Sequence, residues 1–346
     1  SSADKEQIIL ELEQLQTWDV DGEGKGKRKT PIQRLSEWID QCLAKLKQYT
    51  KDIHICGNRN SFSKTDHDAT FMHMKEDYMR NGQLKPGYNV NVATCSDFII
   101  GSYISSDRND VHTLIPFMEQ LRKNYAGRNI GSVVVDSGYE SEENYCWFEA
   151  HPETELYVKP SNHEAAKHRK YRTDISRREN MAYDAQTDTY TCANGKLLQR
   201  TQEKKTHTAS GLEIAISVYE CNECDGCPLK EKCIRACGSK KPLEERYKVI
   251  YVSKRLARQR QAMEAKISSP KGCLLRVNRS IQAEGNFAYV KQDLDFRRFL
   301  LRGNMKVAAE WLLFSLALNI LHLHHKIQNR RLGSGLKIPS SFPAGL

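Results

Sequence analysis

The chain opens with two short amphipathic patterns. Ile8, Leu12 and Leu15 mark a first helix, and a stretch rich in Gly and Lys separates it from a second. Thr30-Pro31 favours the start of that second helix, because the hydroxyl can cap it and proline fits the first turn. Its apolar positions follow a spacing of four and three residues: Leu35, Ile39, Cys42, Leu46 and Tyr49. We therefore expect an antiparallel helical hairpin over residues 1–55, serving as a packing or dimerisation arm.

From Pro86 the pattern changes to that of strands. Alternating apolar residues at 88–92, a turn, and apolar residues at 98–104 predict a β-hairpin. A helix is expected over 110–122, with one apolar face: Leu114, Phe117, Met118 and Leu121. A short strand at 132–135, a helix from Ser141 and a strand at 156–158 complete a β-β-α-β-α-β order. That order predicts an α/β (α+β) fold, with a mixed sheet flanked by helices.

Between Pro160 and Pro270 the chain becomes strongly charged. The alternation of Ile214, Ile216 and Val218 predicts a small β subdomain, which is followed by a basic helix: Lys254, Arg255, Arg258 and Arg260. Helical patterns then return. We divide the chain into a helical arm (1–55), the first part of a core (56–160), an inserted basic, Cys-rich β subdomain (161–270), the last core helices (271–330) and a tail (331–346).

The bulk composition points to a polyanionic partner. Lys and Arg number 53 against 43 Asp and Glu, a formal charge of +10, and such an excess favours nucleic acid without reading its sequence. The longest apolar stretch, residues 307–323, is interrupted by Glu310, Ser315, Asn319 and His322, so we expect no membrane span. No signal peptide pattern is present, and we expect a cytoplasmic protein.

Two carboxylates stand where chemistry is expected. Asp136 follows a short apolar strand, and side chains at the carboxyl ends of strands line the ligand crevice of open α/β sheets. On a helix, Glu284, Phe287 and Lys291 would share one face, and Lys291 could reach a phosphate near a carboxylate-bound cation. A loop aspartate before a turn and a solvated charged helix face are the ordinary alternatives. A basic block with Arg297, Arg298 and Arg302 follows, suited to phosphate contacts.

These residues together resemble the DDE transposases of bacterial insertion sequences. The stretches Asn60 to Met72 and Asn81 to Asn89 are similar to the segment before the family's second core strand. Asp136-Ser-Gly-Tyr139, with Ser141-Glu-Glu-Asn144, resembles its second catalytic Asp motif, and Glu284 with Lys291 resembles its Glu/Lys signature. The family's arginine ahead of the Glu is displaced here, since position 280 is Ser and Arg279 stands beside it. The resemblance covers residues 60–329 and implies an RNase H-like core.

The family's first catalytic Asp, in an Asp-Gly-Thr motif, has no counterpart in this sequence. Either that carboxylate lies upstream of Ser1 in a longer protein, or Asp66 or Asp68 replaces it. We favour the upstream position, because Asp66 and Asp68 lie in a polar loop and not at a strand end. On that hypothesis the present chain binds DNA without cutting it.

The resemblance also implies a mechanism. Two divalent cations held by Asp136, Glu284 and the first carboxylate, for which Asp68 is the candidate in this chain, activate water or a 3′-hydroxyl for attack on a phosphodiester. Hard oxygen ligands suit Mg²⁺, with Mn²⁺ as a substitute. Lys291 completes the expected catalytic set. The expected DNA contacts are Tyr139, Arg279, Arg297, Arg298 and Arg302, and a homodimer on DNA is the expected assembly.

A separate site is expected at the cysteines. Cys221, Cys224, Cys227 and Cys233 supply four thiols within 13 residues, a density that indicates a structural zinc site. An iron–sulfur cluster and free cysteines are the alternatives, and Cys192 or Cys237 could replace one ligand. The competing function for the whole chain is that of a non-catalytic DNA-binding protein, a decayed or domesticated transposase. His322, His324 and His325 are expected to cap a helix or face solvent.

Overall fold

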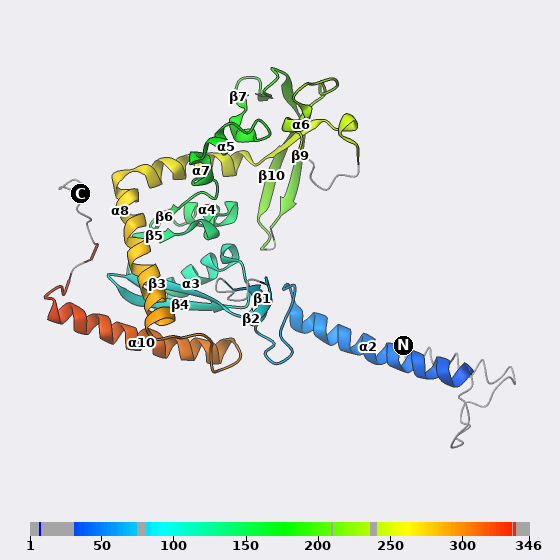
Figure 1. The fold of residues 1–346 in the computed structure, drawn as a ribbon. Helices are drawn as coiled ribbons and strands as arrows, with labels where there is room; N and C mark the ends of the chain where they lie inside the picture. The colour runs from blue at the N-terminus through cyan, green and yellow to red at the C-terminus, as the bar shows by residue number, and fades with distance from the viewer. Residues whose placement is uncertain are drawn as a thin grey trace. The chain divides into compact units, whose positions relative to one another are not determined.

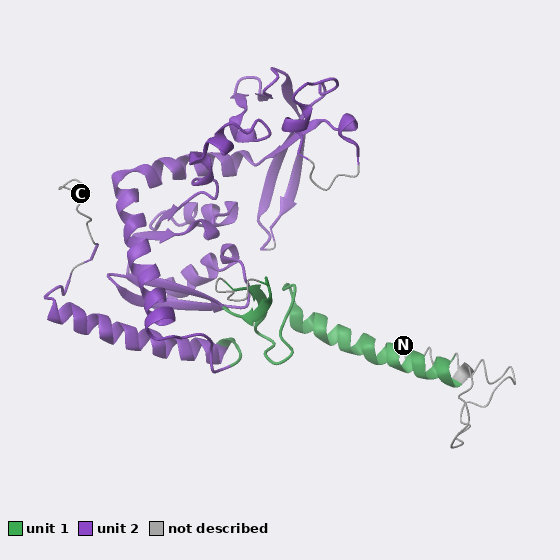
Figure 2. Ribbon diagram, viewed as in Figure 1, with its two compact units in different colours: residues 1–88, 302–304 green, residues 89–301, 305–346 purple. Residues whose placement is uncertain are grey.

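The computed structural model describes residues 7, 31–74, 81–208, 210–235, 241–333 and 335–336. The chain divides into two compact units (Figure 2): unit 1 holds residues 1–88 and 302–304, and unit 2 holds residues 89–301 and 305–346. The expected first arm of the N-terminal hairpin, at residues 8–15, lies outside the described residues. Each unit is described by itself.

Unit 1 is built on the long helix α2 (Pro31–Cys56), which begins at the proline as predicted. After a loop, β1 (Thr70–His73) pairs antiparallel with β2 (Leu84–Gly87). Arg59 fastens the loop to the helix end, because its guanidinium donates to the carbonyl oxygens of Ile55, His67 and Asp68 at 2.8, 2.8 and 3.0 Å. The helix exposes a row of large apolar side chains: Leu35, Trp38, Leu46, Tyr49 and Ile53.

Unit 2 begins with the predicted β-β-α-β-α-β order (Figure 1). Its elements are β3 (Asn89–Cys95), β4 (Phe98–Ser105), η1 (Asp110–His112), α3 (Leu114–Asn124), β5 (Ser132–Val135), η2 (Ser137–Tyr139), α4 (Glu142–Glu149) and β6 (Glu155–Val158). β3 and β4 form the expected hairpin, and β5 pairs parallel with β6. These strands hydrogen-bond as two separate pairs in the described residues, so the predicted single mixed sheet is not seen in them.

The predicted apolar face of α3 is buried in the main core of unit 2. It packs with aromatic residues of α4, with β6 and with Met263 and Ile267 of a later helix. Burying a side chain of this size stabilises the fold by roughly 1.5–3 kcal/mol. The core thus fixes both turns that follow β4 and β5, where the candidate site begins.

Residues 165–252 form the β subdomain with short helical turns at its edges. Its elements are η3 (Ala165–Lys167), α5 (Arg169–Arg172), η4 (Arg178–Asn180), β7 (Ala182–Asp184), β8 (Thr189–Thr191), β9 (Leu197–His207), β10 (Glu213–Cys221), α6 (Lys230–Cys233), η5 (Leu243–Glu245) and β11 (Lys248–Val252). The strands form one antiparallel sheet in the order β11-β10-β9-β8-β7. Leu198, Tyr219 and Ile250 give it a small core of its own.

The chain then returns to helices, as the sequence predicts. They are α7 (Lys254–Ser268), α8 (Pro270–Arg279), η6 (Ser280–Glu284), α9 (Gly285–Ala288), η7 (Tyr289–Asp293) and α10 (Asn304–Gln328). The hydroxyl of Ser269 caps α8, and Pro270 occupies its first turn. η6 and η7 are π-helical turns, and such turns are frequent at functional sites. Glu284 ends the first of them.

Polar side chains fasten the apolar helix α10 within unit 2. The Asn319 amide accepts from the backbone N–H of Ile99 and donates to its carbonyl oxygen, both at 2.8 Å. Glu310 accepts from the N–H groups of Leu300 and Leu301 at 3.0 Å. His322 is half-buried and lies 2.9 Å from the Asn286 Oδ1, whereas His324 and His325 are exposed, as expected. Polar contacts therefore explain the interruptions in the apolar stretch.

In length and composition α10 could also cross a membrane, the one described helix that could. Because an apolar core helix of a soluble protein passes the same test, the length and composition of α10 are weak evidence for a membrane span. The sequence predicted no membrane span, because polar residues interrupt this apolar stretch. The stretch is nevertheless hydrophobic enough for a spanning helix.

The basic helix α7 pairs most of its cationic side chains with acidic side chains of unit 2. Its Arg255 binds Glu142 at 2.6 Å, and Lys254 binds Asp188 at 2.7 Å. Arg260 donates to both Glu140 oxygens at 2.7 and 2.9 Å. Arg258 remains exposed. Three of its cationic side chains are therefore paired within unit 2, two with Glu140 and Glu142 near Asp136 and one with Asp188 of the β subdomain.

The Glu140–Arg260 pair should be a measurable source of stability. Burial would raise the pKa of the Glu140 carboxyl, but hydrogen bonds from Arg260 and Ser161 outweigh it and lower that pKa. We expect Glu140→Gln to reduce the free energy of unfolding by about 3 kcal/mol at pH 7, because it strips a partly buried guanidinium of its counter-charge. Unfolding in denaturant measures this change in the free energy of unfolding.

The sign of the pH dependence follows from the lowered pKa. The pair stabilises the fold above the unfolded carboxyl pKa of about 4.3, and this contribution is lost as the pH falls through the folded value. The difference in the free energy of unfolding between wild type and Glu140→Gln should therefore become smaller from pH 6 toward pH 3. Glu119→Gln, on the exposed side of α3, is the matched control. A gap that stays constant with pH would contradict the assignment.

Candidate carboxylate site

Asp136 lies at the carboxyl end of β5, as predicted. Its Oδ1 accepts a hydrogen bond from the Gly138 N–H at 2.8 Å and so caps the short turn η2. Its side chain is 48% exposed, and solvent or a ligand can therefore reach the carboxylate. The end of a strand that pairs in parallel is where α/β folds place their ligands.

A second carboxylate beside it, Asp110, was not identified from the sequence. It begins η1, and its Oδ1 accepts from the Asn89 amide at 2.7 Å. A Cβ at Gly138 would lie 3.0 Å from the Asp136 Oδ1 and 3.1 Å from the Asp110 Oδ2. The two carboxylates thus face the same glycine, and any larger residue would press on both. No spacing in the sequence marks Asp110, since the residue looks like an ordinary helix start.

A chain of hydrogen bonds joins Tyr139 to β3. The Tyr139 hydroxyl donates to the Asn91 Oδ1, and the Thr113 hydroxyl donates to the same oxygen at 2.9 Å. Burial raises the pKa of the Tyr139 hydroxyl, and the charges of Asp110 and Asp136 raise it further. The phenol therefore stays neutral and serves as an internal donor. The structure gives the Tyr139 hydroxyl this internal contact, and the DNA contact expected for Tyr139 stays a prediction.

The buried Asn144 fastens the two turns that carry these carboxylates. Its amide donates to the carbonyl oxygens of Tyr139 at 2.7 Å and Val111 at 3.0 Å, one in η2 and one in η1. The side chain is 1% exposed. Ser141 caps the helix α4 that holds it. The Ser141 to Asn144 stretch therefore positions the site, although no atom of the Asn144 side chain need touch a ligand.

Glu284 is linked to Asp136 through one arginine. The Arg279 Nη2 lies 2.9 Å from the Glu284 Oε1, and its Nη1 lies 3.9 Å from the Asp136 Oδ2. The guanidinium is 27% exposed, and the Glu284 carboxylate is 63% exposed. Arg279, whose displaced position left its role open, thus contacts both carboxylates expected from sequence. It brings together groups that are 148 positions apart in the chain.

The helix carrying Glu284 is anchored on its other side. Gln282 accepts from the Asp97 N–H at 3.4 Å, and Asn286 donates to the Asp97 carbonyl oxygen at 3.3 Å. Lys291 lies beyond, exposed, with its Nζ 5.9 Å from the centre of the Phe287 ring. The π-helical turn η7 also departs from the α-helical spacing on which a shared face with Glu284 was predicted. No contact described for Lys291 joins it to the carboxylates.

Asp66 and Asp68 hold a backbone segment within unit 1. Asp66 accepts from the Tyr88 hydroxyl at 2.6 Å and from the Gly303 N–H at 3.2 Å. Asp68 accepts from the Asn304 N–H at 2.8 Å. Burial raises the pKa of the Tyr88 hydroxyl, and the bond to Asp66 raises it further. Both carboxylates therefore have a structural use in joining residues 303–304 to the rest of unit 1.

The side chains of the basic block after Glu284 are partly buried at some positions and exposed at others. Phe296 and Phe299 pack against an apolar cluster, while Arg298 and Arg302 are exposed. Arg297 is exposed as well and pairs with Asp295 at 2.6 Å. Arg298 and Arg302 therefore remain the more accessible of the predicted phosphate contacts.

The arrangement suits a hard cation by its donor chemistry. Asp110, Asp136 and Glu284 offer carboxylate oxygens, the ligands that Mg²⁺ prefers, and Arg279 is the guanidinium that contacts Asp136 and Glu284 among the described residues. In the described residues no three His, Cys, Asp or Glu side chains stand close enough to hold a metal ion. Arg279 lies between Asp136 and Glu284, so a shared ion would require their side chains to turn.

The four cysteines of the predicted zinc motif lie at the end of β10 and around α6. Cys221, Cys224 and Cys233 are buried, and Cys227 is half-buried. Burial raises the pKa of the Cys221 thiol to about 11, with neighbouring Cys224 and Cys192 adding to it. The thiols are thus neighbours, yet no three converge closely enough for a metal among the described residues. Cys237 lies outside the described residues.

Comparison with known proteins bears on the second half of the chain. Residues 191–324 match the family model of the transposase DDE domain. This segment is similar to the DDE domain of transposases. It runs from β8 into α10 and contains Glu284, Lys291 and the four cysteines, while Asp136 and Asp110 precede it. No curated protein matches the chain, and no solved structure matches it.

The predicted zinc site at the cysteines can be tested directly. If zinc is bound, the purified chain should contain about one zinc per protein, and replacing Cys221 and Cys224 with Ser should remove it. Elemental analysis by mass spectrometry reads out zinc and iron together. Cys273→Ser, away from the motif, should leave the metal content unchanged. Protein without zinc or iron would mean that these are free, buried thiols.

Proposed function

We propose that the chain is the catalytic part of an insertion-sequence transposase with an RNase H-like core, which cuts and joins DNA with a divalent cation. The observation that carries the proposal is the set of carboxylates around Arg279 and Gly138, where Asp136 follows a strand as the family's motif requires. The matched DDE segment, which includes Glu284, supports it. The mixed α/β order of unit 2 supports it more weakly, because folds of this class host many activities.

Asp136, Glu284 and Asp110 would hold the cation, with Mg²⁺ preferred and Mn²⁺ as its substitute. Bound there, the cation would activate a water or 3′-hydroxyl nucleophile and stabilise the leaving oxygen. The chain's own residues set the geometry: Asn144 holds both turns, and Asn89 orients the Asp110 carboxylate. Gly138 leaves room between Asp110 and Asp136.

The third carboxylate is proposed to be Asp110. The sequence suggested a residue upstream of Ser1, or Asp66 or Asp68 in its place. Asp66 and Asp68 bind the backbone of residues 303–304, whereas Asp110 stands beside Asp136. If Asp110 completes the site, all three carboxylates lie within this sequence.

One observation favours a second candidate, a non-catalytic DNA-binding protein. Arg279 already neutralises part of the charge on Asp136 and Glu284, as a site that no longer holds a cation would do. Such a protein would keep its exposed arginines Arg298 and Arg302 and its positive charge. It would bind DNA in the cytoplasm without cutting it. Cleavage by the purified chain decides between the two.

We expect the chain to nick supercoiled plasmid DNA with Mg²⁺ or Mn²⁺ and not with EDTA. Asp136→Asn, Glu284→Gln and Asp110→Asn should each lower the nicking rate by at least about 100-fold, since each removes an anionic ligand of the reacting cation. Gel electrophoresis of the plasmid measures the rate. The exposed Glu119→Gln of α3 is the matched control.

The pattern among the variants identifies the third ligand. Loss of nicking in Asp68→Asn or Asp66→Asn, with folding intact and Asp110→Asn active, would move that role to unit 1. A chain inactive with both metals, but active once an upstream Asp-Gly-Thr strand is restored, would place it in a longer protein. DNA binding without nicking in every form would support the non-catalytic alternative.

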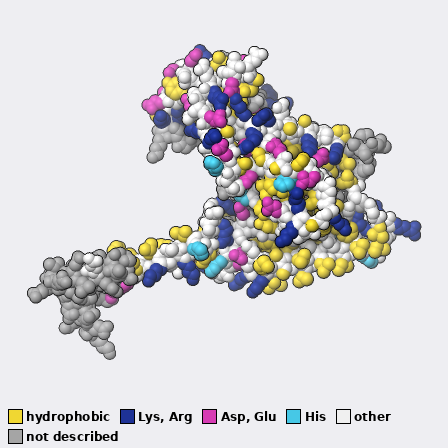
Figure 3. All heavy atoms as spheres, turned by 180° about the vertical axis from the view of Figure 1, so that it is seen from behind, with side chains coloured by type: hydrophobic (Ala, Val, Ile, Leu, Met, Phe, Trp, Pro, Cys, Tyr) yellow, Lys and Arg dark blue, Asp and Glu magenta, His cyan; other side chains and the backbone are white. Residues whose placement is uncertain are grey.

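A homodimer is proposed through the exposed side of α10. Apolar side chains follow each other there at helical spacing: Leu312, Leu316, Ile320, Leu323 and Ile327, each at least 43% exposed. Hydrophobic side chains gather along the lower edge of the view in Figure 3, where this helix lies. Spacing by three and four residues lets two such helices interlock.

The dimer has a direct test. Wild-type chain should show twice the chain mass by light scattering, and Leu316→Glu combined with Ile320→Glu should give a monomer, because two charges would enter the apolar seam. Lys306→Glu, on the same helix, controls for a change of charge alone. A dimer that survives the double change would place the interface elsewhere.

A further inference from the structure

A pocket of about 670 Å³ lies in the β subdomain, away from any residue used above. It is formed by the segment around α5 and by the stretch after α6. The residues that concern its chemistry are His168, Lys170, Tyr171, Asp174, Arg177 and Arg235. Four of these six can be cationic and only one is acidic, a balance that favours an anionic ligand.

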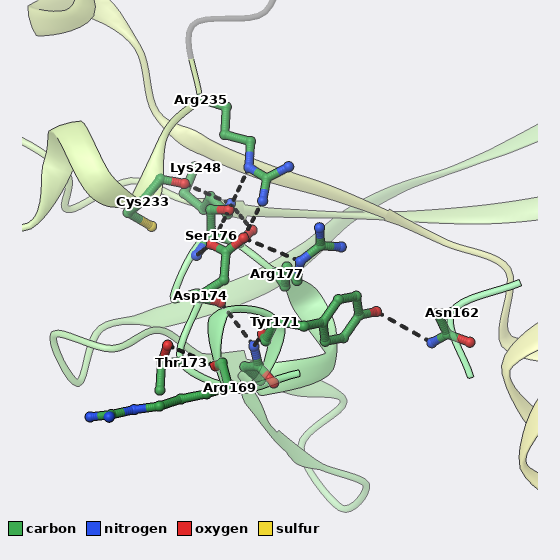
Figure 4. A network of polar contacts seen from close by, with 11 residues as sticks. Asn162, Arg169, Tyr171, Thr173, Asp174, Ser176, Arg177, Cys233, Arg235 and Lys248 are labelled. Atoms are coloured by element: carbon green, nitrogen blue, oxygen red, sulfur yellow. Dashed lines mark hydrogen bonds and ion pairs between the residues drawn. The ribbon is translucent and has the colours of Figure 1, made fainter. Parts of the chain in front are cut away.

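Asp174 holds the two arginines in place (Figure 4). Its Oδ1 accepts from the Ser176 N–H at 3.0 Å and from the Ser176 hydroxyl at 2.6 Å. Its Oδ2 lies 3.2 Å from the Arg177 Nε and is hydrogen-bonded to Arg235. The Ser176 hydroxyl lowers the pKa of Asp174 to about 2, with Arg235 contributing, so the carboxylate stays charged at neutral pH.

A buried lysine joins the two segments of the pocket. The Lys248 Nζ donates to the Ser176 carbonyl oxygen at 2.7 Å and to that of Cys233 at 2.9 Å. Arg235 follows Cys233 by two residues, and its Nε donates to the Ser176 hydroxyl at 2.7 Å. The Arg235 side chain is nevertheless 57% exposed. Its guanidinium is therefore oriented by the protein while several N–H groups remain open to solvent.

The pocket carries more positive charge than its own acid can balance. Asp174 offsets one of the two arginines, and no hydrogen bond or ion pair is described for the Lys170 and His168 side chains. Tyr171 adds an aromatic wall, with the Arg177 guanidinium carbon 4.0 Å from its ring centre. Fixed guanidinium groups beside a free lysine and an aromatic ring match a phosphate with its attached nucleoside.

We propose that this pocket binds a phosphate carried by a nucleotide unit, separately from the carboxylate site. The same chemistry is presented by the DNA backbone and by a free mononucleotide. Asp174 acts as a positioning residue, because it orients Arg235 and Arg177 without being able to attract a phosphate itself. Binding here needs no divalent cation, so a failure of the proposed cleavage activity would leave this inference standing.

The test measures DNA binding by the full chain in EDTA, using the fluorescence anisotropy of a labelled 30-base-pair duplex. Arg235→Gln and Lys170→Gln should each weaken binding about fivefold at moderate salt and lower the slope of log affinity against log salt by about one. Arg128→Gln, which removes an exposed arginine elsewhere in unit 2, should cause less than about twofold loss.

Asp174→Asn separates positioning from bulk charge. Removing a negative charge should strengthen DNA binding if only net charge matters, whereas loss of the Arg235 anchor should weaken it about threefold or more. Thermal unfolding checks that the variant is folded. Lys170→Gln removes no described contact, so it tests the pocket even if Asp174→Asn unfolds.

A second arm distinguishes the source of the phosphate. Titration calorimetry with deoxyadenosine monophosphate should show no binding at millimolar nucleotide if the pocket takes the DNA backbone. Nucleotide binding that is lost in Arg235→Gln, with duplex affinity unchanged, would assign the pocket to a free nucleotide. Variants that bind both duplex and nucleotide as wild type does, or that behave like Arg128→Gln, would overturn the proposal.

Discussion

The candidate site depends on one buried amide. Asn144 donates to the Val111 and Tyr139 carbonyl oxygens, and these belong to the turns that begin with Asp110 and follow Asp136. Two carboxylates that face one glycine repel each other, so their turns would separate without a fixed link. A buried amide donor is costly to leave unpaired, which makes both bonds persistent. The α3–α4 core then holds Asn144 itself in place.

The sequence predicted the elements of unit 2 well, because each had a local cause. Strand alternation at 89–104, the apolar face of α3 and the Ser141 cap all depend on neighbours in the chain. Asp136 could be found for the same reason, since it directly follows a strand. Asp110 could not, because its closeness to Asp136 arises from the packing of two distant turns. The single mixed sheet was likewise an inference about pairing, which local patterns do not determine.

The basic positions in the sequence were a poor guide to which cationic side chains remain unpaired in the structure. Arg255, Arg260 and Lys254 satisfy acidic partners inside unit 2, so the helix that looked most basic contributes little free charge. The pocket around Arg235 shows the reverse case, since its cations come from separated segments joined by Lys248. A sequence window averages charges along the chain, whereas binding depends on which charges remain unpaired in space.

Arg279 decides how the carboxylates could pass from this arrangement to one that holds a cation. Its contacts with Asp136 and Glu284 involve carboxylates that are about half exposed or more, and ion pairs of this kind contribute about 0–1 kcal/mol each. A divalent cation attracts the same oxygens with twice the charge at shorter range. The guanidinium can therefore yield its place at small cost, and it would then lie free beside the carboxylates, where a phosphate of bound DNA is its natural partner.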